Sequence, residues 1–168
     1  VPADVSMLSI TGDYEVIYLP GTYGTGSAVT DMKPHNNILT LRGALFTRAG
    51  YTQVGWATVD GGEKVYDFED IYTKNEALTL YPVWNTNKYT ITFDTNGGSE
   101  IAPITQDYGT QIAAPANPTR KGYTFKGWDK EIPETMPAEN ITVKAQWEIN
   151  QYTITFDTNG GSEIAPIT

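Results

Sequence analysis

The chain has 168 residues, enough for one ordinary domain or two small ones, and eleven Lys and Arg against twenty Asp and Glu give it a net charge of −9. This charge argues against a nucleic-acid partner and against docking on anionic lipid, and no apolar run approaches the roughly 18 residues of a membrane helix, so direct membrane insertion is not expected. Cysteine is absent and histidine occurs once, at His35, which excludes disulfides, thiol catalysis and multi-histidine metal sites and favours a non-enzymatic protein without cofactor or metal.

Alternating apolar residues predict the strands of the N-terminal half. Tyr14, Val16 and Tyr18 share one face of the first strand. Residues 38–46 are ambiguous between helix and strand, because a glycine interrupts an otherwise apolar stretch. Residues 78–84 are apolar at every second position and are predicted to close this half as a strand.

The second half has a stronger pattern. Residues 89–94 alternate strictly and predict a half-buried strand, followed by a turn at Asn96, Gly97 and Gly98, because Asn and Gly tolerate positive φ. The chain is expected to return as a strand over residues 100–105. Prolines limit a helix near residues 108–114 to two turns, and further strands are expected at residues 123–128 and 141–147. The fold class is therefore mainly β, or α+β, with at most one short helix in each half.

Internal repeats explain why the two halves look alike. Residues 89–105 and 152–168 both read YTITFDTNGGSEIAPIT, identical at all seventeen positions and 63 residues apart, which only a tandem duplication explains. Trp84 and Trp147 are 63 residues apart as well, and each is followed by four residues and then a tyrosine. Such short linkers predict close coupling of neighbouring modules into a semi-rigid rod.

An older copy of the repeat lies upstream. The string TRAGYTQVGW at residues 47–56 matches TRKGYTFKGW at residues 119–128, and the first copy has nine more residues before its second tryptophan, in a loop near residues 60–71. The domains are therefore predicted as a lead segment at residues 1–12, a divergent repeat A at 13–86, a repeat B at 87–149 and the truncated start of a third repeat at 150–168.

Two tryptophans in each repeat are expected to supply much of a small core. Their recurrence at matched positions favours packing over the alternative, aromatic platforms for sugars, and Trp128→Ala is predicted to cost roughly 3–5 kcal/mol. The predicted structural core consists of Trp56, Trp84, Trp128, Trp147, Tyr51 and Tyr123.

Three strings carry a resemblance to a known family. They are PTRKGYTFKGW at residues 118–128, YTITFDTNGG at 89–98, and VKAQW at 143–147. Together they resemble the Listeria–Bacteroides repeat family, which includes the B repeat of internalin-type surface proteins. Repeat A departs from the pattern, with Phe46 in place of the proline and Gln53 in place of the phenylalanine.

The resemblance implies a β-grasp-like module that occurs in tandem in secreted and cell-wall-attached bacterial proteins. It therefore implies an extracellular location at the bacterial surface, as a stalk or an adhesive unit. The family brings no catalytic residues, so none is assigned here.

Other motifs fit a structural interpretation better than a chemical one. LPGTY at residues 19–23 is one residue from a sortase signal but lacks the apolar tail. The acidic turn at residues 94–100 fails the EF-hand pattern, because Gly98 occupies position 5 and Thr105 position 12. His35 lies in a polar stretch and is expected to be solvated, and a Lys–Asn isopeptide cross-link stays open.

The sequence thus favours a non-enzymatic stalk or spacer region of a bacterial surface protein, an adhesin, whose partners are the adjacent repeats of the same chain. The alternative is a binding module for a host protein or a glycan, centred on the repeat A loops, with Tyr66, Tyr72 and Tyr81 as the candidate binding surface and Tyr23 as a further exposed aromatic residue. Residues 152–168 form a hairpin without the rest of a sheet and are expected to promote self-association.

Overall fold

A computed structural model describes residues 12–168, so the predicted lead segment at 1–12 lies outside the described residues except for Gly12. The chain divides into two compact units, Val1–Asn87 and Lys88–Thr168, and the division falls one residue from the predicted boundary between repeats A and B. The prediction of a mainly β chain is confirmed, and residues 12–168 contain strands but no helix.

The first unit, repeat A, is built on a four-stranded sheet in the order β2-β1-β6-β4. Its central pair, β1 and β6, is parallel, whereas β2 and β4 run antiparallel to their neighbours. A second, two-stranded sheet joins β3 to β5. The strands are β1 Tyr14–Tyr18, β2 Val29–Lys33, β3 Leu39–Thr40, β4 Tyr51–Ala57, β5 Ile71–Tyr72 and β6 Leu78–Thr86.

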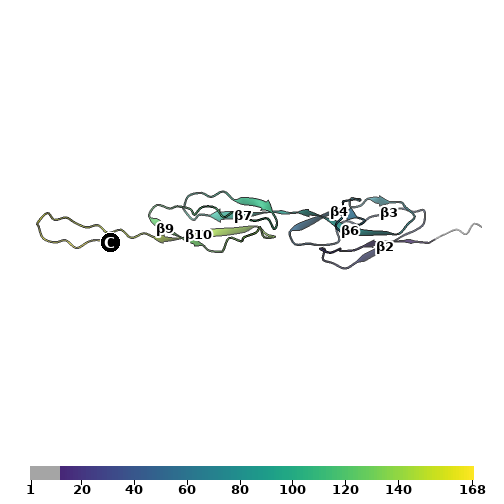
Figure 1. The fold of residues 1–168 in the computed structure, drawn as a ribbon, viewed down its shortest axis with the longest axis horizontal. Helices are drawn as coiled ribbons and strands as arrows, with labels where there is room; N and C mark the ends of the chain where they lie inside the picture. Colours follow the sequence, from purple (N-terminus) through teal and green to yellow (C-terminus); the bar gives the residue numbers. More distant parts are fainter. Residues whose placement is uncertain (1–11) are drawn as a thin grey trace, which may run out of the picture. The chain divides into compact units, whose positions relative to one another are not determined.

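The second unit repeats this topology in the order β8-β7-β10-β9, again with a parallel central pair, β7 and β10. The strands β7, β9 and β10 of this unit are labelled in Figure 1, and β10 pairs with both of the others. This strand order agrees with the β-grasp-like module that the resemblance implies. The strands are β7 Lys88–Asp94, β8 Ile104–Asp107, β9 Tyr123–Trp128 and β10 Ile141–Ile149.

A crossover without a helix connects the parallel strands of repeat B. Parallel neighbours need such a crossover, and in many folds a helix provides it. Here the segment at residues 108–114 pairs instead with the segment before β10, since the Ile112 N–H donates to the Glu134 carbonyl and the Met136 N–H to the Thr110 carbonyl, at 2.8 and 2.9 Å. The short helix allowed at this position is therefore absent, because these backbone groups bond to another segment and prolines follow.

Each unit has its own hydrophobic core. In β10, Val143 and Ala145 are buried while Lys144 and Gln146 are exposed, which is the alternation expected of a sheet with one covered face. The core of repeat B consists of Ile91, Phe93, Met136 and Val143. The core of repeat A consists of Val16, Tyr18, Leu41, Phe46, Trp56, Tyr72 and Leu80.

The predicted core aromatic residues differ in burial. Trp56 is fully buried, whereas Trp84, Trp128 and Trp147 are half-buried. Trp84 and Trp128 pack against the cores of their repeats. Tyr51 and Tyr123 are also half-buried and lie outside both core clusters. Each has an arginine guanidinium over its ring, so these two tyrosines lie at the surface of their repeats and not in the core.

The turn after β7 has the backbone that its residues suggest, but the return strand begins later than predicted. Asn96 and Gly97 have φ of 48° and 88°, and the Gly98 N–H donates to the Thr95 carbonyl at 3.0 Å. The strand predicted at residues 100–105 is instead β8, which begins at Ile104. The residues between turn and strand pack elsewhere, since the Ser99 N–H donates to the Thr119 carbonyl at 2.8 Å.

The second copy of the 17-residue sequence lies in a different environment. Ile91 and Phe93 are 0% and 6% exposed in repeat B, whereas the identical Ile154 and Phe156 are 59% and 42% exposed. In the described tail, one antiparallel bridge joins Ile154 to Ile167. The same residues therefore bury their side chains only where a partner like β10 lies beside them.

Candidate functional site

A small cavity lies at the surface of repeat A, between the turn after β1, the nine-residue insertion and β6. Its volume is about 210 Å³, on the small side for a ligand pocket. The side chains and backbone that line it come from residues distant in sequence. They include Tyr23, Arg48, Asp60, Gly62, Val83 and Trp84.

Asp60 joins two walls of this cavity. One of its oxygens, Oδ2, accepts hydrogen bonds from the Thr22 backbone N–H at 2.8 Å and from the Thr22 hydroxyl at 2.6 Å. The other oxygen approaches Gly21, where an added Cβ would lie 2.3 Å from Oδ1. Gly21 also has a φ of +66°, so only glycine fits the turn that Asp60 holds.

Arg48 lies between two aromatic rings. Its guanidinium carbon is 4.5 Å from the centroid of the Tyr23 ring and 3.6 Å from that of Tyr51. Stacking of this kind fixes the plane of the guanidinium, so that its N–H bonds point outward in that plane, parallel to the ring faces. Arg48 therefore presents oriented donors beside the cavity.

The insertion packs along the outer edge of β4. The Trp56 N–H donates to the Tyr66 carbonyl at 2.9 Å, and the Val65 and Tyr66 N–H groups donate to the Trp56 carbonyl at 2.8 and 3.0 Å. An added Cβ at Gly55 would lie 2.7 Å from the Tyr66 carbonyl oxygen, so this close approach also requires glycine. The insertion is thus tied to the sheet at one end and to the β1 turn, through Asp60, at the other.

The aromatic residues predicted for a binding surface do not line the cavity. Tyr72 is 2% exposed and donates through its hydroxyl to the Glu76 carbonyl at 3.1 Å, so its assignment to the surface is wrong. The Tyr66 ring packs edge-on against Tyr72 with centroids 6.2 Å apart, and Tyr81 is half-buried on β6. Of the aromatic residues considered, Tyr23 and Trp84 are the two at the cavity.

The sequence did not identify Arg48 and Asp60 as candidate site residues. Asp60 and Thr22 are 38 residues apart, so no local pattern indicates their contact. Arg48 had a usable signal, because an arginine three residues before a tyrosine recurs at Arg120 and Tyr123, where the guanidinium carbon lies 3.8 Å from the ring centroid.

The groups whose pKa is shifted lie in other parts of repeat A. Burial raises the pKa of Tyr18 and of Tyr72, both core residues. A hydrogen bond to Asp31 raises the pKa of Arg42, whose Nη2 lies 2.6 Å from that carboxylate. None of these three groups lines the cavity.

A histidine expected to be solvated and a lysine beside an asparagine are both engaged in hydrogen bonds. His35 is half-buried and its Nδ1 lies 2.9 Å from the Tyr14 hydroxyl, which corrects the expectation of a solvated side chain. The buried Lys33 donates from Nζ to Asn75 Oδ1 at 3.1 Å and to the Pro34 carbonyl at 3.3 Å. This is the lysine–asparagine proximity that a cross-link needs, but Asn75 is exposed to solvent and is held by hydrogen bonds to Asn36.

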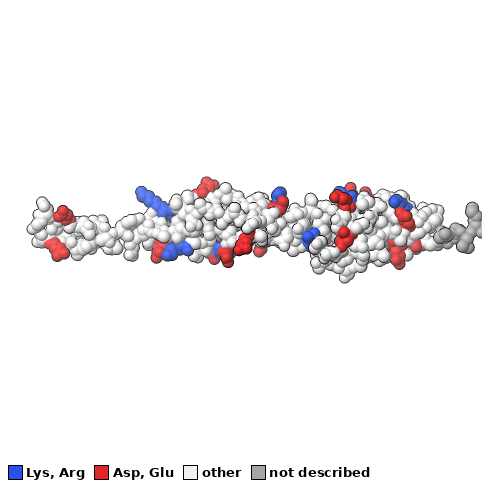
Figure 2. Space-filling model, viewed as in Figure 1, with Lys and Arg blue, Asp and Glu red and all other residues white. Residues whose placement is uncertain are grey.

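Charged groups form no cluster that would suggest another site. Within residues 12–168, no group of three or more His, Cys, Asp or Glu side chains is placed to hold a metal ion, and no helix could cross a membrane. On the face drawn in Figure 2, acidic and basic side chains are interspersed on both units. That face therefore carries no continuous basic patch.

Comparison with known proteins places both repeats in one family. The model of the Listeria–Bacteroides repeat domain matches residues 14–83 and 89–146. A protein of Evansella cellulosilytica named as a Gly-rich membrane protein is 38% identical over 128 residues, covering 70% of this chain and 15% of the relative.

Two further relatives agree. A membrane protein of the same organism is 36% identical over 71% of this chain and 19% of its own length, and Internalin H of Listeria monocytogenes is 37% identical over 62% of this chain and 20% of its own. The chain thus spans no more than a fifth of these relatives. Because the family model covers most of both repeats, the chain belongs to the Listeria–Bacteroides repeat domain family.

Proposed function

We propose that these repeats are a non-enzymatic spacer on the outer surface of a bacterial cell, holding an adhesive domain of the same protein away from the wall. Family membership supports this, as do relatives named as membrane proteins and as an internalin. A spacer must transmit position along the chain, so the joints between its modules are the features on which the proposal depends.

The linker after repeat A is short, and hydrogen bonds hold it to its own repeat. A single residue, Asn87, separates the end of β6 from the start of β7. Its N–H donates to the Gly50 carbonyl at 2.9 Å, and its Oδ1 accepts from the Thr52 hydroxyl at 2.7 Å. Asn87 is therefore fixed to β4 of its own repeat and adds little freedom to the joint.

The same device recurs after repeat B. The Asn150 N–H donates to the Gly122 carbonyl at 2.9 Å, and its Oδ1 accepts from the Thr124 hydroxyl at 2.6 Å. One asparagine thus closes each repeat in the same way. A clamp repeated after both repeats is what a spacer of limited flexibility needs, and it is the observation that carries the proposal.

Nitrogen-15 relaxation on the whole chain tests this. We expect the amides of both repeats to report one common rotational diffusion tensor, because a stiff joint makes them tumble together. A Gly-Ser-Gly-Ser insertion between Asn87 and Lys88 is the reference for a free joint and should separate the two tensors. If the unmodified chain behaves like the insertion variant, the spacer proposal fails.

Thr52→Val tests the clamp itself. Removing the hydroxyl should loosen the joint after repeat A and shift the relaxation data toward the insertion variant. Thr124→Val is the matched control, because it removes the equivalent bond at the other joint and should leave the coupling of repeats A and B unchanged.

A further inference from the structure

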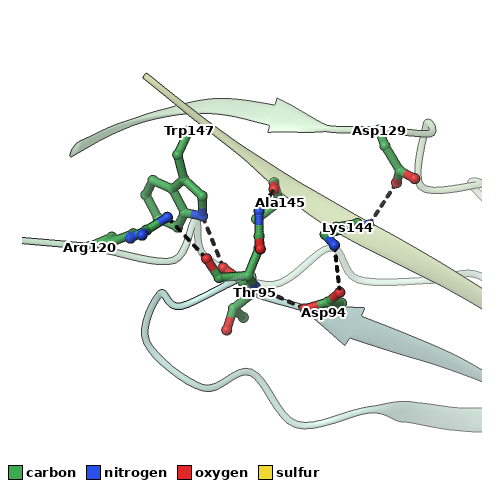
Figure 3. Close-up of polar contacts among 8 residues, drawn as sticks. Asp94, Thr95, Arg120, Asp129, Lys144, Ala145 and Trp147 are labelled. Atoms are coloured by element: carbon green, nitrogen blue, oxygen red, sulfur yellow. Dashed lines mark hydrogen bonds and ion pairs between the residues drawn. The ribbon is translucent and has the colours of Figure 1, made fainter. Parts of the chain in front are cut away.

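The two repeats carry the same three surface groups, an arginine, a tyrosine and a tryptophan, and use them differently. In repeat B these are Arg120, Tyr123 and Trp147. Arg120 Nη1 donates to the Asn96 carbonyl at 3.2 Å, and Trp147 Nε1 donates to the Thr95 carbonyl at 3.0 Å. Figure 3 shows both side chains directed at the turn after β7.

The turn of repeat B leaves no space beside Trp147. A Cβ added at Gly98 would lie 2.5 Å from Trp147 Cζ2, so the indole ring lies directly on the turn backbone. One guanidinium N–H of Arg120 and the indole N–H of Trp147 are thus bonded to the turn of their own repeat. In repeat B the turn therefore occupies both the indole N–H of Trp147 and the space beside its ring.

In repeat A the matching donors are open. The turn after β1 is bonded to Asp60 of the insertion instead. Within the described residues, neither the Arg48 guanidinium nor the Trp84 indole N–H donates a hydrogen bond to the protein, and both groups line the cavity of about 210 Å³. The groups that hold the turn in repeat B therefore border this cavity in repeat A.

The residues that line the cavity of repeat A indicate the class of ligand that would fit it. It combines oriented donors on Arg48 and Trp84, a carboxylate acceptor on Asp60, and the aromatic faces of Tyr23 and Trp84. Sugar rings present hydroxyl groups along their edges and C–H bonds on their faces, which suits paired donors and acceptors beside an aromatic ring. A cavity this small admits one ring of a glycan.

We propose that repeat A binds a saccharide unit of a glycan in the cavity formed by Tyr23, Arg48, Asp60 and Trp84, and that repeat B does not. Arg48 and the Trp84 N–H donate to ring hydroxyls, Asp60 accepts from one, and an aromatic ring supports the sugar face. Binding at this site is independent of the spacer role, because a stiff or a flexible joint leaves the cavity unchanged.

Indole N–H resonances of the nitrogen-15-labelled chain give a direct test. The probes are the methyl glycosides of glucose, galactose, mannose, N-acetylglucosamine and glucuronic acid, each titrated into the millimolar range expected for a single sugar. We expect the Trp84 resonance, assigned with a Trp84→Phe variant, to move saturably with at least one probe. The Trp147 resonance is the internal control and should stay in place.

Two variants tie the shift to the cavity. Arg48→Gln removes a charge-assisted donor and should weaken binding about tenfold. Arg120→Gln makes the matched change in repeat B and should leave the Trp84 titration unaltered. An unchanged Trp56 resonance shows that repeat A stays folded in Arg48→Gln, and Tyr23→Ala serves as a second variant that should also weaken binding.

Three results would overturn the proposal. They are the absence of a saturable Trp84 shift with all five probes, an equal movement of Trp147, and an affinity of Arg48→Gln equal to that of the unmodified chain. Failure here leaves the relaxation test of the joints untouched, so the two proposals can fall separately.

Discussion

Trp56 and Trp128 occupy matched positions in the two repeats, yet their removal should have unequal effects. Trp56 is fully buried and contacts three aromatic rings, with centroids 4.9 Å away for Tyr18, 6.0 Å for Phe46 and 6.2 Å for Phe68. Its Nε1 also donates to the Arg42 carbonyl at 2.8 Å. Truncating a buried tryptophan costs about 3–5 kcal/mol, and the lost hydrogen bond adds about 1 kcal/mol.

We therefore expect Trp56→Ala to lower the free energy of unfolding of repeat A by about 4–6 kcal/mol, which approaches the whole stability of a small domain. Trp128 is half-exposed and, within the described residues, its indole N–H donates no hydrogen bond. Trp128→Ala should cost repeat B only about 2–3 kcal/mol, less than its position in the sequence suggested.

Urea titration followed by resolved indole resonances measures both variants in the whole chain. Trp84 reports unfolding of repeat A, Trp147 reports unfolding of repeat B, and both remain in either variant. Trp56→Phe keeps repeat A measurable should the alanine variant unfold in buffer. Equal losses for Trp56→Ala and Trp128→Ala would refute the assignment of the two rings to different depths.

Three further outcomes follow from differences between matched positions. Burial raises the pKa of Tyr18, so the contribution of this side chain to stability is complete below the ordinary pKa of 10.0 and is lost as the pH rises through the higher pKa of the folded state. Repeat B has Phe93 at the matching position, so repeat A should unfold in alkali before repeat B. The reverse order in a pH titration would contradict this. Gly98→Ala should cost repeat B about 2 kcal/mol in urea unfolding, because the added Cβ meets the indole ring of Trp147. Gly161→Ala, in the identical tail sequence, should change the same transition little. Similar effects of the two variants would show that the Trp147 ring moves aside freely. Removing residues 151–168 should lower the concentration-dependent mass of the chain in light scattering, and an unchanged mass would exclude self-association through the exposed apolar side chains of this hairpin.

Local patterns sufficed for most of the strands. Strict alternation places Ile91, Phe93 and Val143 on a covered face, and the structure buries all three. The pattern could not place the start of β8, because residues 99–103 are drawn away by a bond from Ser99 to Thr119, twenty residues along the chain. The alternation of apolar residues shows which side chains a strand buries. It does not show which distant backbone groups will take the hydrogen bonds of a given residue.

The candidate site was out of reach for the same reason. Its aromatic residues could be suspected from composition, but burial separated Tyr23, which is 63% exposed, from Tyr72, which is 2% exposed. The cavity itself depends on a bond between Thr22 and Asp60, and that contact exists only because the insertion follows the edge of β4 back to the turn. A comparison of the two repeats in sequence shows the insertion but not where it lies.

The insertion also changes how repeat A protects its sheet. In repeat B, β9 is one of the two outer strands of its sheet. Its edge is protected by the charged Lys126, which pairs with Glu148 at 3.1 Å, and by a register shift between Gln146 and Trp147 on the neighbouring β10. Repeat A covers the equivalent edge of β4 with the insertion.

Covering the edge of β4 stabilises repeat A whether or not a ligand binds. The gain in stability alone is therefore a sufficient reason for the nine extra residues. Asp60 then lies where it bonds the β1 turn and leaves Arg48 and Trp84 without the partners that their counterparts have in repeat B. The proposed saccharide site would arise in this way with little loss of stability. Deleting the insertion should therefore both expose the β4 edge and return the two donors to the turn.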